Sequence, residues 1–190
     1  MSNLKESFEE HLKLVSDCSK DPQFSMQVER CIDLMVNCLK NSNKILFCGN
    51  GGSAADSAHL AAELSGKFKM ERKPLNAEAL HVNGSSLTAI ANDFGYEQVF
   101  SRVLEAKAQS GDLLFAMSTS GHSANILKAL EKALELNLSI IYLTGEISQP
   151  LSQTLDVHIQ IPSTNTPRIQ ELMILTGHHI CESIESQLFG

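Results

Sequence analysis

Proline and glycine are scarce in this chain, with 5 prolines and 11 glycines among 190 residues. This composition excludes a collagen-like repeat and argues against a long disordered region. No apolar run approaches the roughly 20 residues that a membrane-spanning helix needs. The N-terminal residues also lack the charged-then-apolar pattern of a signal peptide. We therefore expect one globular domain over residues 1–190, with no membrane segment.

The cysteines form no recognisable motif. Their number is odd, no CxxC pair occurs, and they are scattered at Cys18, Cys31, Cys38, Cys48 and Cys181. This pattern indicates neither a disulfide framework nor a zinc ribbon. Cys31 and Cys38 stand at heptad spacing in a helical pattern, so we expect them to be buried as small apolar side chains. A reducing, cytoplasmic location follows.

A basic surface is also missing. The formal net charge is −7 and the isoelectric point is near 5.5. Because contacts with phosphate backbones need lysine and arginine, this balance argues against nucleic acid as the main ligand. We expect no nucleic-acid partner.

The apolar periodicity predicts an α/β fold. Residues 1–40 are predicted to form two helices on either side of Asp21-Pro22, which either cap the sheet of their own chain or contribute to oligomerisation. Further on, short apolar segments alternate with helical ones, which predicts a parallel sheet with helices on both faces. The expected strands are 44–48, 77–82, 112–117, 139–143 and 157–161, and the expected helices are 53–64, 85–93, 97–108, 123–136 and 168–188.

Two loops follow predicted strands, at the edge where open α/β sheets bind ligands. In Cys48-Gly-Asn-Gly-Gly-Ser53 the glycines allow close backbone approach, and Ser53 is the expected helix N-cap. In Ser118-Thr-Ser-Gly-His-Ser123 the hydroxyls surround one glycine at a helix start, which suits phosphate. Either loop alone is better explained as a turn with capping serines, but the two together favour phosphate binding. Neither matches a P-loop or a Rossmann fingerprint, so nucleotide binding is disfavoured.

A histidine and a glutamate share one face of the predicted helix after the first loop. His59 and Glu63 stand four residues apart, a spacing that suits metal ligation or an acid–base pair. By spacing alone, a surface hydrogen bond between the two side chains is the better explanation. Apolar neighbours predict that the helix is buried, however, and a buried carboxylate needs a partner.

The C-terminal helix carries further polar candidates. Gln170 and His178 lie about 12 Å apart along an ideal helix axis, so one straight helix does not obviously aim both at one ion. Glu171 lines up better with His178 and is an alternative to Gln170. Gly177 is a place where the helix could loosen, and His179 is interpreted as a neighbour without a functional role.

These motifs together resemble the SIS (sugar isomerase) family. Within it the chain is similar to the phosphoheptose isomerases, which interconvert sedoheptulose 7-phosphate and D-glycero-D-manno-heptose 7-phosphate. That reaction is the first step of ADP-heptose synthesis for the inner core of bacterial lipopolysaccharide. The resemblance covers essentially the whole chain and is carried by Cys48-Gly-Asn-Gly-Gly-Ser53, His59-x₃-Glu63, Ala91-Asn-Asp-Phe-Gly95, Ser118-Thr-Ser-Gly-x-Ser123, Leu143-Thr-Gly145 and Arg168-Ile-Gln-Glu171.

The resemblance implies a single SIS domain with a flavodoxin-like, doubly wound sheet of five parallel strands, in a homotetramer with active sites between subunits. It implies Glu63 and His178 as the catalytic acid–base pair. Lys67 and Pro167 depart from residues common in the family. The implied ligands of one zinc ion per subunit are His59, Glu63, Gln170 and His178. The implied substrate-binding residues are Asn50, Gly51, Gly52, Glu63, Asn92, Asp93, Ser118, Thr119, Ser120, Ser123 and Gln170.

The chemistry suits these residue types. Aldose–ketose exchange moves a proton between adjacent carbons through an enediol(ate), so it needs a base, an acid and stabilisation of the oxyanion. Zinc polarises a carbonyl as a Lewis acid. A group that ligates zinc is a poorer base, so either ligation by Glu63 and His178 loosens during turnover or the metal-bound and catalytic states differ.

The alternative is a non-catalytic binding module. The DnaA initiator-associating protein is a tetrameric SIS relative that binds a replication initiator, and it shares the loops and the leading helices. It lacks the acid–base pair, whereas this chain has both Glu63 and His178, which favours the isomerase. A sugar-phosphate-sensing regulator usually carries an additional DNA-binding domain, for which this chain has no room.

Overall fold

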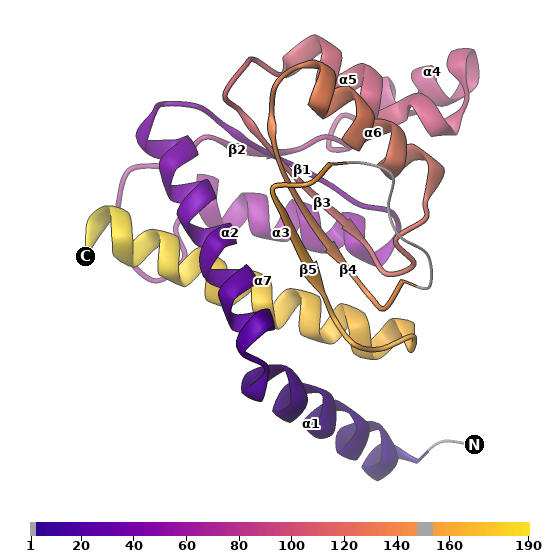
Figure 1. The fold of residues 1–190 in the computed structure, drawn as a ribbon. Coiled ribbons are helices and arrows are strands. Elements are labelled where there is room, and N and C mark those ends of the chain that lie inside the picture. The colour runs from indigo at the N-terminus through magenta and orange to yellow at the C-terminus, as the bar shows by residue number, and fades with distance from the viewer. Residues whose placement is uncertain (1–2, 148–153) are drawn as a thin grey trace.

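The computed structural model describes residues 3–147 and 154–190 and has three layers, a central sheet with helices on both faces (Figure 1). In this part of the chain the sheet has five parallel strands, as predicted, and their order is β2-β1-β3-β4-β5. The strands are β1 Ile45–Cys48, β2 Ala77–Ala79, β3 Leu113–Ser118, β4 Ser139–Thr144 and β5 Val157–Gln160. The helices are α1 Leu4–Lys20, α2 Pro22–Lys40, α3 Gly52–Ser65, α4 Gly84–Phe94, the 3₁₀ turn η1 Tyr96–Gln98, α5 Val99–Lys107, α6 Ala124–Glu135 and α7 Thr166–Phe189.

The two faces of the sheet are covered by different helices. On one face α2, α3 and α7 pack against the strands, and on the other face α5 and α6 do so (Figure 1). Every residue of β1 and β3 is buried. Burial on both faces explains why these strands are continuous apolar runs in the sequence instead of alternating patterns.

The two leading helices differ in how they pack. Helix α2 begins at Pro22, where Asp21 accepts a hydrogen bond from the Gln23 amide, and it buries an apolar stripe against the core. Helix α1 extends away from the sheet (Figure 1) and buries only Leu14 and Cys18 among its residues. Its exposed apolar side chains are Leu4, Phe8 and Leu12, with 70%, 61% and 66% of their surface accessible. Of the two alternatives left by the sequence, α2 caps its own sheet, while α1 leaves an apolar stripe uncovered.

The five cysteines are all free and buried, and the burial of Cys31 and Cys38 confirms the prediction made for these two. Burial is the largest influence on the thiol of Cys38 and raises its pKa to about 11. The thiol therefore stays protonated at neutral pH and packs as an apolar group.

None of the described helices is long and apolar enough to cross a membrane.

Candidate active site and metal centre

The two predicted phosphate-binding loops meet where the strand order reverses. They are called the glycine loop (residues 48–53) and the serine loop (residues 118–123). The chain leaves β1 for β2 on one side and later places β3 on the other side, so the loops that follow β1 and β3 are neighbours. Asn50 in the first loop and Asn125 after the second exchange two amide hydrogen bonds, each 2.8 Å long. This junction is the position at which open α/β sheets bind their ligands.

The glycine loop turns into α3 one residue earlier than the sequence predicts. Gly51 has a φ of 55° and is the N-cap residue, and the helix begins at Gly52. Ser53 therefore lies buried in the first turn, so its predicted role as the N-cap was wrong. A Cβ on Gly52 would stand 2.3 Å from Nε2 of Gln170, which shows that the Gln170 amide rests directly on this loop.

The serine loop gathers its hydroxyls. Oγ of Ser118 lies 3.4 Å from Oγ of Ser120 and 3.2 Å from Oγ of Ser123. Ser123 precedes α6, yet its side chain makes no capping hydrogen bond. Gly121, with a φ of 69°, lets the chain turn tightly around these groups. The hydroxyls therefore face one another beside a helix N-terminus instead of only capping it, an arrangement suited to an anion.

The strongest constellation joins α3 to α7. His59, Glu63 and His178 bring one nitrogen or oxygen atom each to within 4.8 Å of one another. Nε2 of His59 lies 2.8 Å from Nε2 of His178 and 3.3 Å from Oε1 of Glu63. The Glu63 side chain is 22% exposed, so the expected burial of this carboxylate is only partial within one chain.

The donor set of this cluster fits zinc. Two imidazoles and one carboxylate are the protein ligands of catalytic zinc sites that keep a fourth position open for substrate or water. Tetrahedral ligation with zinc–nitrogen bonds of about 2.0–2.1 Å separates two nitrogens by about 3.3 Å. The separation between His59 and His178 is close to this value, so small ring rotations would admit the ion.

A glycine sets the spacing between the two helices. A Cβ on Gly177 would lie 2.7 Å from both methyl carbons of Leu60, which is fully buried. The absence of that Cβ lets α7 approach α3 and brings His178 to His59. Helix α7 runs without interruption from Thr166 to Phe189, so the suggestion that Gly177 loosens it was wrong.

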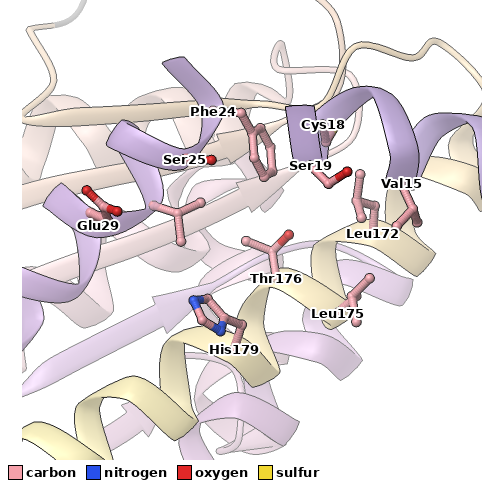
Figure 2. A pocket seen from close by; sticks show the side chains of 11 residues that line it. Val15, Cys18, Ser19, Phe24, Ser25, Glu29, Leu172, Leu175, Thr176 and His179 are labelled. Carbon is pink, nitrogen blue, oxygen red and sulfur yellow. The ribbon is translucent and has the colours of Figure 1, made fainter. Parts of the chain in front are cut away.

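The other polar candidates of α7 point to different places. Gln170 contacts the glycine loop, about 12 Å from His178 along the helix axis by the usual rise. Glu171 pairs with Arg168 and with His11 of α1, so its carboxylate is already engaged. His179 lies away from the cluster, in a cavity of about 400 Å³ between α7 and the two leading helices (Figure 2).

Two candidate substrate residues are exposed in the single chain. Asn92 donates a 2.7 Å hydrogen bond to Asp93 at the end of α4. The following turn is tied to the glycine loop, because the Tyr96 hydroxyl donates to Oδ1 of Asn50 over 3.2 Å. The side chain of Asn50 is thus held between Tyr96 and Asn125.

The sequence reasoning missed several residues around the site. Asp56 lies one helical turn before His59, and that spacing was a usable signal. Burial is the largest influence on Asp56 and raises its pKa, although the charges of His59 and His178 act in the opposite direction. No sequence pattern indicated Tyr96 or Asn125, because each hydrogen-bonds to Asn50, which is far away in the sequence.

Several known proteins are similar to this chain in sequence. The model of the SIS domain matches residues 9–145. The phosphoheptose isomerase of Shewanella sediminis is 43% identical over 100% of this chain and 96% of its own length. That of Helicobacter hepaticus is 50% identical over 84% of this chain and 82% of its own length.

Solved structures agree with the sequence comparison. The phosphoheptose isomerase of Neisseria gonorrhoeae has a TM-score of 0.89 and 39% identity, covering 96% of this chain and 97% of its own. That of Francisella tularensis has a TM-score of 0.91 and 33% identity, covering 98% and 100%. The chain therefore belongs to the SIS domain family, and within that family to the phosphoheptose isomerases.

Proposed function

We propose that this protein interconverts sedoheptulose 7-phosphate and D-glycero-D-manno-heptose 7-phosphate, the first step toward the ADP-heptose of the lipopolysaccharide inner core. The observation that carries the proposal is the convergence of His59, Glu63 and His178 from α3 and α7, with α3 starting directly from the glycine loop. The names of full-length relatives support the same reaction.

Glu63 and His178 are the proposed proton-transfer pair. One takes the proton from the carbon next to the carbonyl, and the other exchanges a proton with the substrate oxygen, which carries the sugar through an enediol(ate). His59, Glu63, Gln170 and His178 are the proposed ligands of one zinc ion per subunit. When bound, zinc polarises the substrate carbonyl as a Lewis acid.

The serine loop is the proposed phosphate site. Its three converging hydroxyls stand at the start of α6, where the helix dipole favours an anion. The other proposed substrate contacts come from the glycine loop, α3, the end of α4, and α7. Together with the serine loop, the proposed substrate-binding residues are Asn50, Gly51, Gly52, Glu63, Asn92, Asp93, Ser118, Thr119, Ser120, Ser123 and Gln170.

Replacing both Ser118 and Ser120 by alanine tests the phosphate site. Each lost hydrogen bond to a charged group costs about 1.5–3 kcal/mol, so the KM for the sugar phosphate should rise at least about tenfold. The kcat should change little, because the loop binds the phosphate equally in the ground state and the transition state. Steady-state kinetics separates the two constants, and a loss confined to kcat would contradict the assignment.

We also propose a homotetramer with sites completed between subunits, in the cytoplasm. Two observations support the assembly. Gln170 is about 12 Å along α7 from His178, which makes it difficult for one helix to supply both ligands to one ion. The apolar stripe of Leu4, Phe8 and Leu12 on α1 is exposed in the single chain. Buried free thiols are consistent with a reducing compartment.

The direct test is incubation with sedoheptulose 7-phosphate, followed by NMR detection of the aldoheptose phosphate. We expect turnover that is lost on chelation and restored by zinc. Failure of the assembled, zinc-supplied protein to form the aldose would reject the isomerase and favour a binding module. Turnover that survives complete removal of metal would reject the zinc proposal alone.

A further inference from the structure

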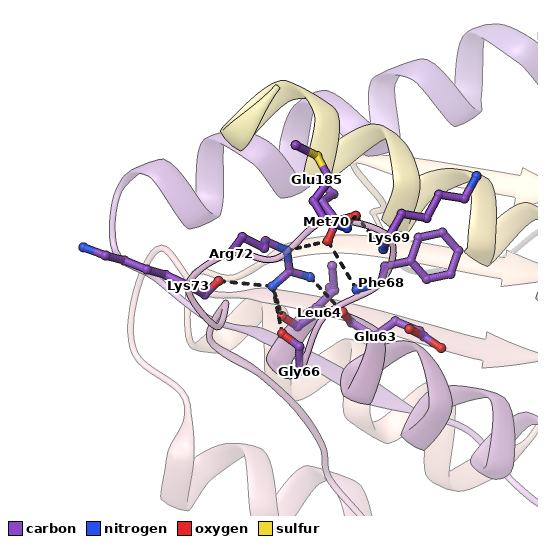
Figure 3. A network of polar contacts seen from close by, with 9 residues as sticks. All are labelled: Glu63, Leu64, Gly66, Phe68, Lys69, Met70, Arg72, Lys73 and Glu185. Atoms are coloured by element: carbon purple, nitrogen blue, oxygen red, sulfur yellow. Dashed lines mark hydrogen bonds and ion pairs between the residues drawn. The ribbon is translucent and has the colours of Figure 1, made fainter.

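The segment after α3 is fastened to α7 by one buried carboxylate. Glu185 accepts backbone N–H groups from Phe68, Lys69 and Met70 at 3.2, 2.8 and 2.9 Å (Figure 3). It also accepts Nε of Arg72 at 2.8 Å, and both side chains are 1% exposed. The carboxylate thus fixes the backbone of residues 68–70, which belongs to no helix or strand.

The partner of that carboxylate holds the end of α3. The guanidinium of Arg72 donates to the carbonyl oxygens of Glu63, Leu64 and Gly66 at 2.8, 2.9 and 3.1 Å (Figure 3). The first two carbonyls belong to the last turn of α3 and the third to its C-cap residue, where no intrahelical donors are left for them. A cation at this end also complements the helix dipole. Arg72 therefore anchors the main chain of Glu63 from the side opposite its carboxylate.

The segment of residues 68–70 places an aromatic ring, that of Phe68, against the candidate metal cluster. The ring of Phe68 stacks on the imidazole of His178, with centroids 5.6 Å apart and planes inclined by 27°. His59 meets the same imidazole edge-on, with centroids 5.1 Å apart and an angle of 69°. Phe68 restricts the ring plane of His178 without hydrogen bonding to it, so the stacking itself uses neither ring nitrogen.

We infer that Phe68 is a positioning residue for His178, and that the buried Arg72–Glu185 pair holds Phe68 in place. The stacked ring keeps Nε2 of His178 directed at His59 and Glu63. Arg72 of the same ion pair also holds the backbone of Glu63. The Arg72–Glu185 pair therefore helps to fix the positions of both proposed proton-transfer residues. This inference rests on the proposed function for its kinetic consequence but not for its geometry.

Phe68→Leu tests the stacked ring, and Phe68→Tyr restores it. Mutation of a group that orients a metal ligand typically lowers metal affinity or activity by about 10–100-fold. We expect Phe68→Leu to weaken zinc binding by the metal-free protein about tenfold, measured by competition with a chelator. We expect its kcat to fall about as much while the KM changes less than about twofold, and Phe68→Tyr to resemble the parent in all three constants.

Phe24→Leu is the matched control, because Phe24 is also a partly buried ring packed on the same core cluster but belongs to α2 and lines the cavity beside α1. Equal changes in zinc affinity in Phe24→Leu and Phe68→Leu would indicate general loosening and overturn the inference. Unchanged zinc affinity and kcat in Phe68→Leu would overturn it as well.

Histidine ring spectra separate this inference from the proposed function. In ¹⁵N-histidine NMR of the metal-free protein, Phe68→Leu should shift or broaden the ring signals of His178, and Phe24→Leu should leave them unchanged. This readout needs neither zinc nor turnover. If the parent chain fails to isomerise the substrate, the function is rejected while the spectra still decide the positioning role. Unaltered His178 signals in Phe68→Leu would overturn that role.

Discussion

Replacing Glu63 by glutamine is expected to abolish turnover while largely sparing phosphate binding. Glutamine keeps the size of the side chain but cannot take up a proton, and positioned general bases contribute about 10²–10⁴-fold to rates. The serine loop connects β3 to α6, so a substitution on α3 should leave its conformation unchanged. We expect kcat to fall by about 10³-fold or more, measured by NMR of the aldose product, with the affinity for inorganic phosphate within about twofold.

Two measurements sharpen the interpretation of the Glu63 variant. Glu182→Gln makes the same change at an exposed carboxylate of α7 and should behave like the parent. Zinc content must be measured in parallel, because Glu63 is also a proposed ligand. Activity restored by excess zinc would show that Glu63 acts through the metal and not as the base. Activity retained at ordinary zinc would remove it from both roles.

Replacing Arg72 by methionine is expected to produce a large loss of stability. The substitution leaves the Glu185 carboxylate buried without its cation, and removing one partner of a buried ion pair costs about 3–5 kcal/mol. Urea unfolding at neutral pH measures the loss in the free energy of unfolding. The control is Lys69→Met, which breaks the exposed Lys69–Glu182 pair between the same segment and the same helix. That variant should lose less than about 1 kcal/mol.

The Arg72 variant should also change how stability depends on pH. Burial alone would raise the pKa of Glu185, but hydrogen bonds from Lys69, Met70, Phe68 and Arg72 outweigh it and hold the pKa below the ordinary 4.5. The carboxylate therefore stabilises the fold above that value, and the contribution is lost as the pH falls through the lowered pKa. Without Arg72 the pKa rises toward its ordinary value, so this acid-induced loss should shrink. An equal acid-induced loss in parent and variant, or a variant as stable as Lys69→Met, would contradict the assignment.

The fold was predictable because its signals are local. The strands are apolar runs that parallel sheets bury on both faces, and the helices repeat their apolar residues with the period of the α-helix. The same local logic placed the glycine and serine loops at the carboxyl ends of neighbouring strands and put His59 on one face with Glu63. It failed at Ser53, because Gly51, with its positive φ, is the N-cap residue two positions before the predicted hydroxyl cap.

The sequence by itself determined the fold class, the glycine and serine loops and the His59–Glu63 pair. Only the tertiary structure decided which distant groups join them. His178 reaches His59 across 119 residues because Gly177 lets α7 pack closely on Leu60, whereas the carboxylate of Glu171 pairs with Arg168 and with His11 of α1. The Arg72–Glu185 pair likewise depends on α7 passing beside the end of α3. Such contacts depend on which surfaces pack together, and the spacing of residues along the chain does not predict which surfaces these are.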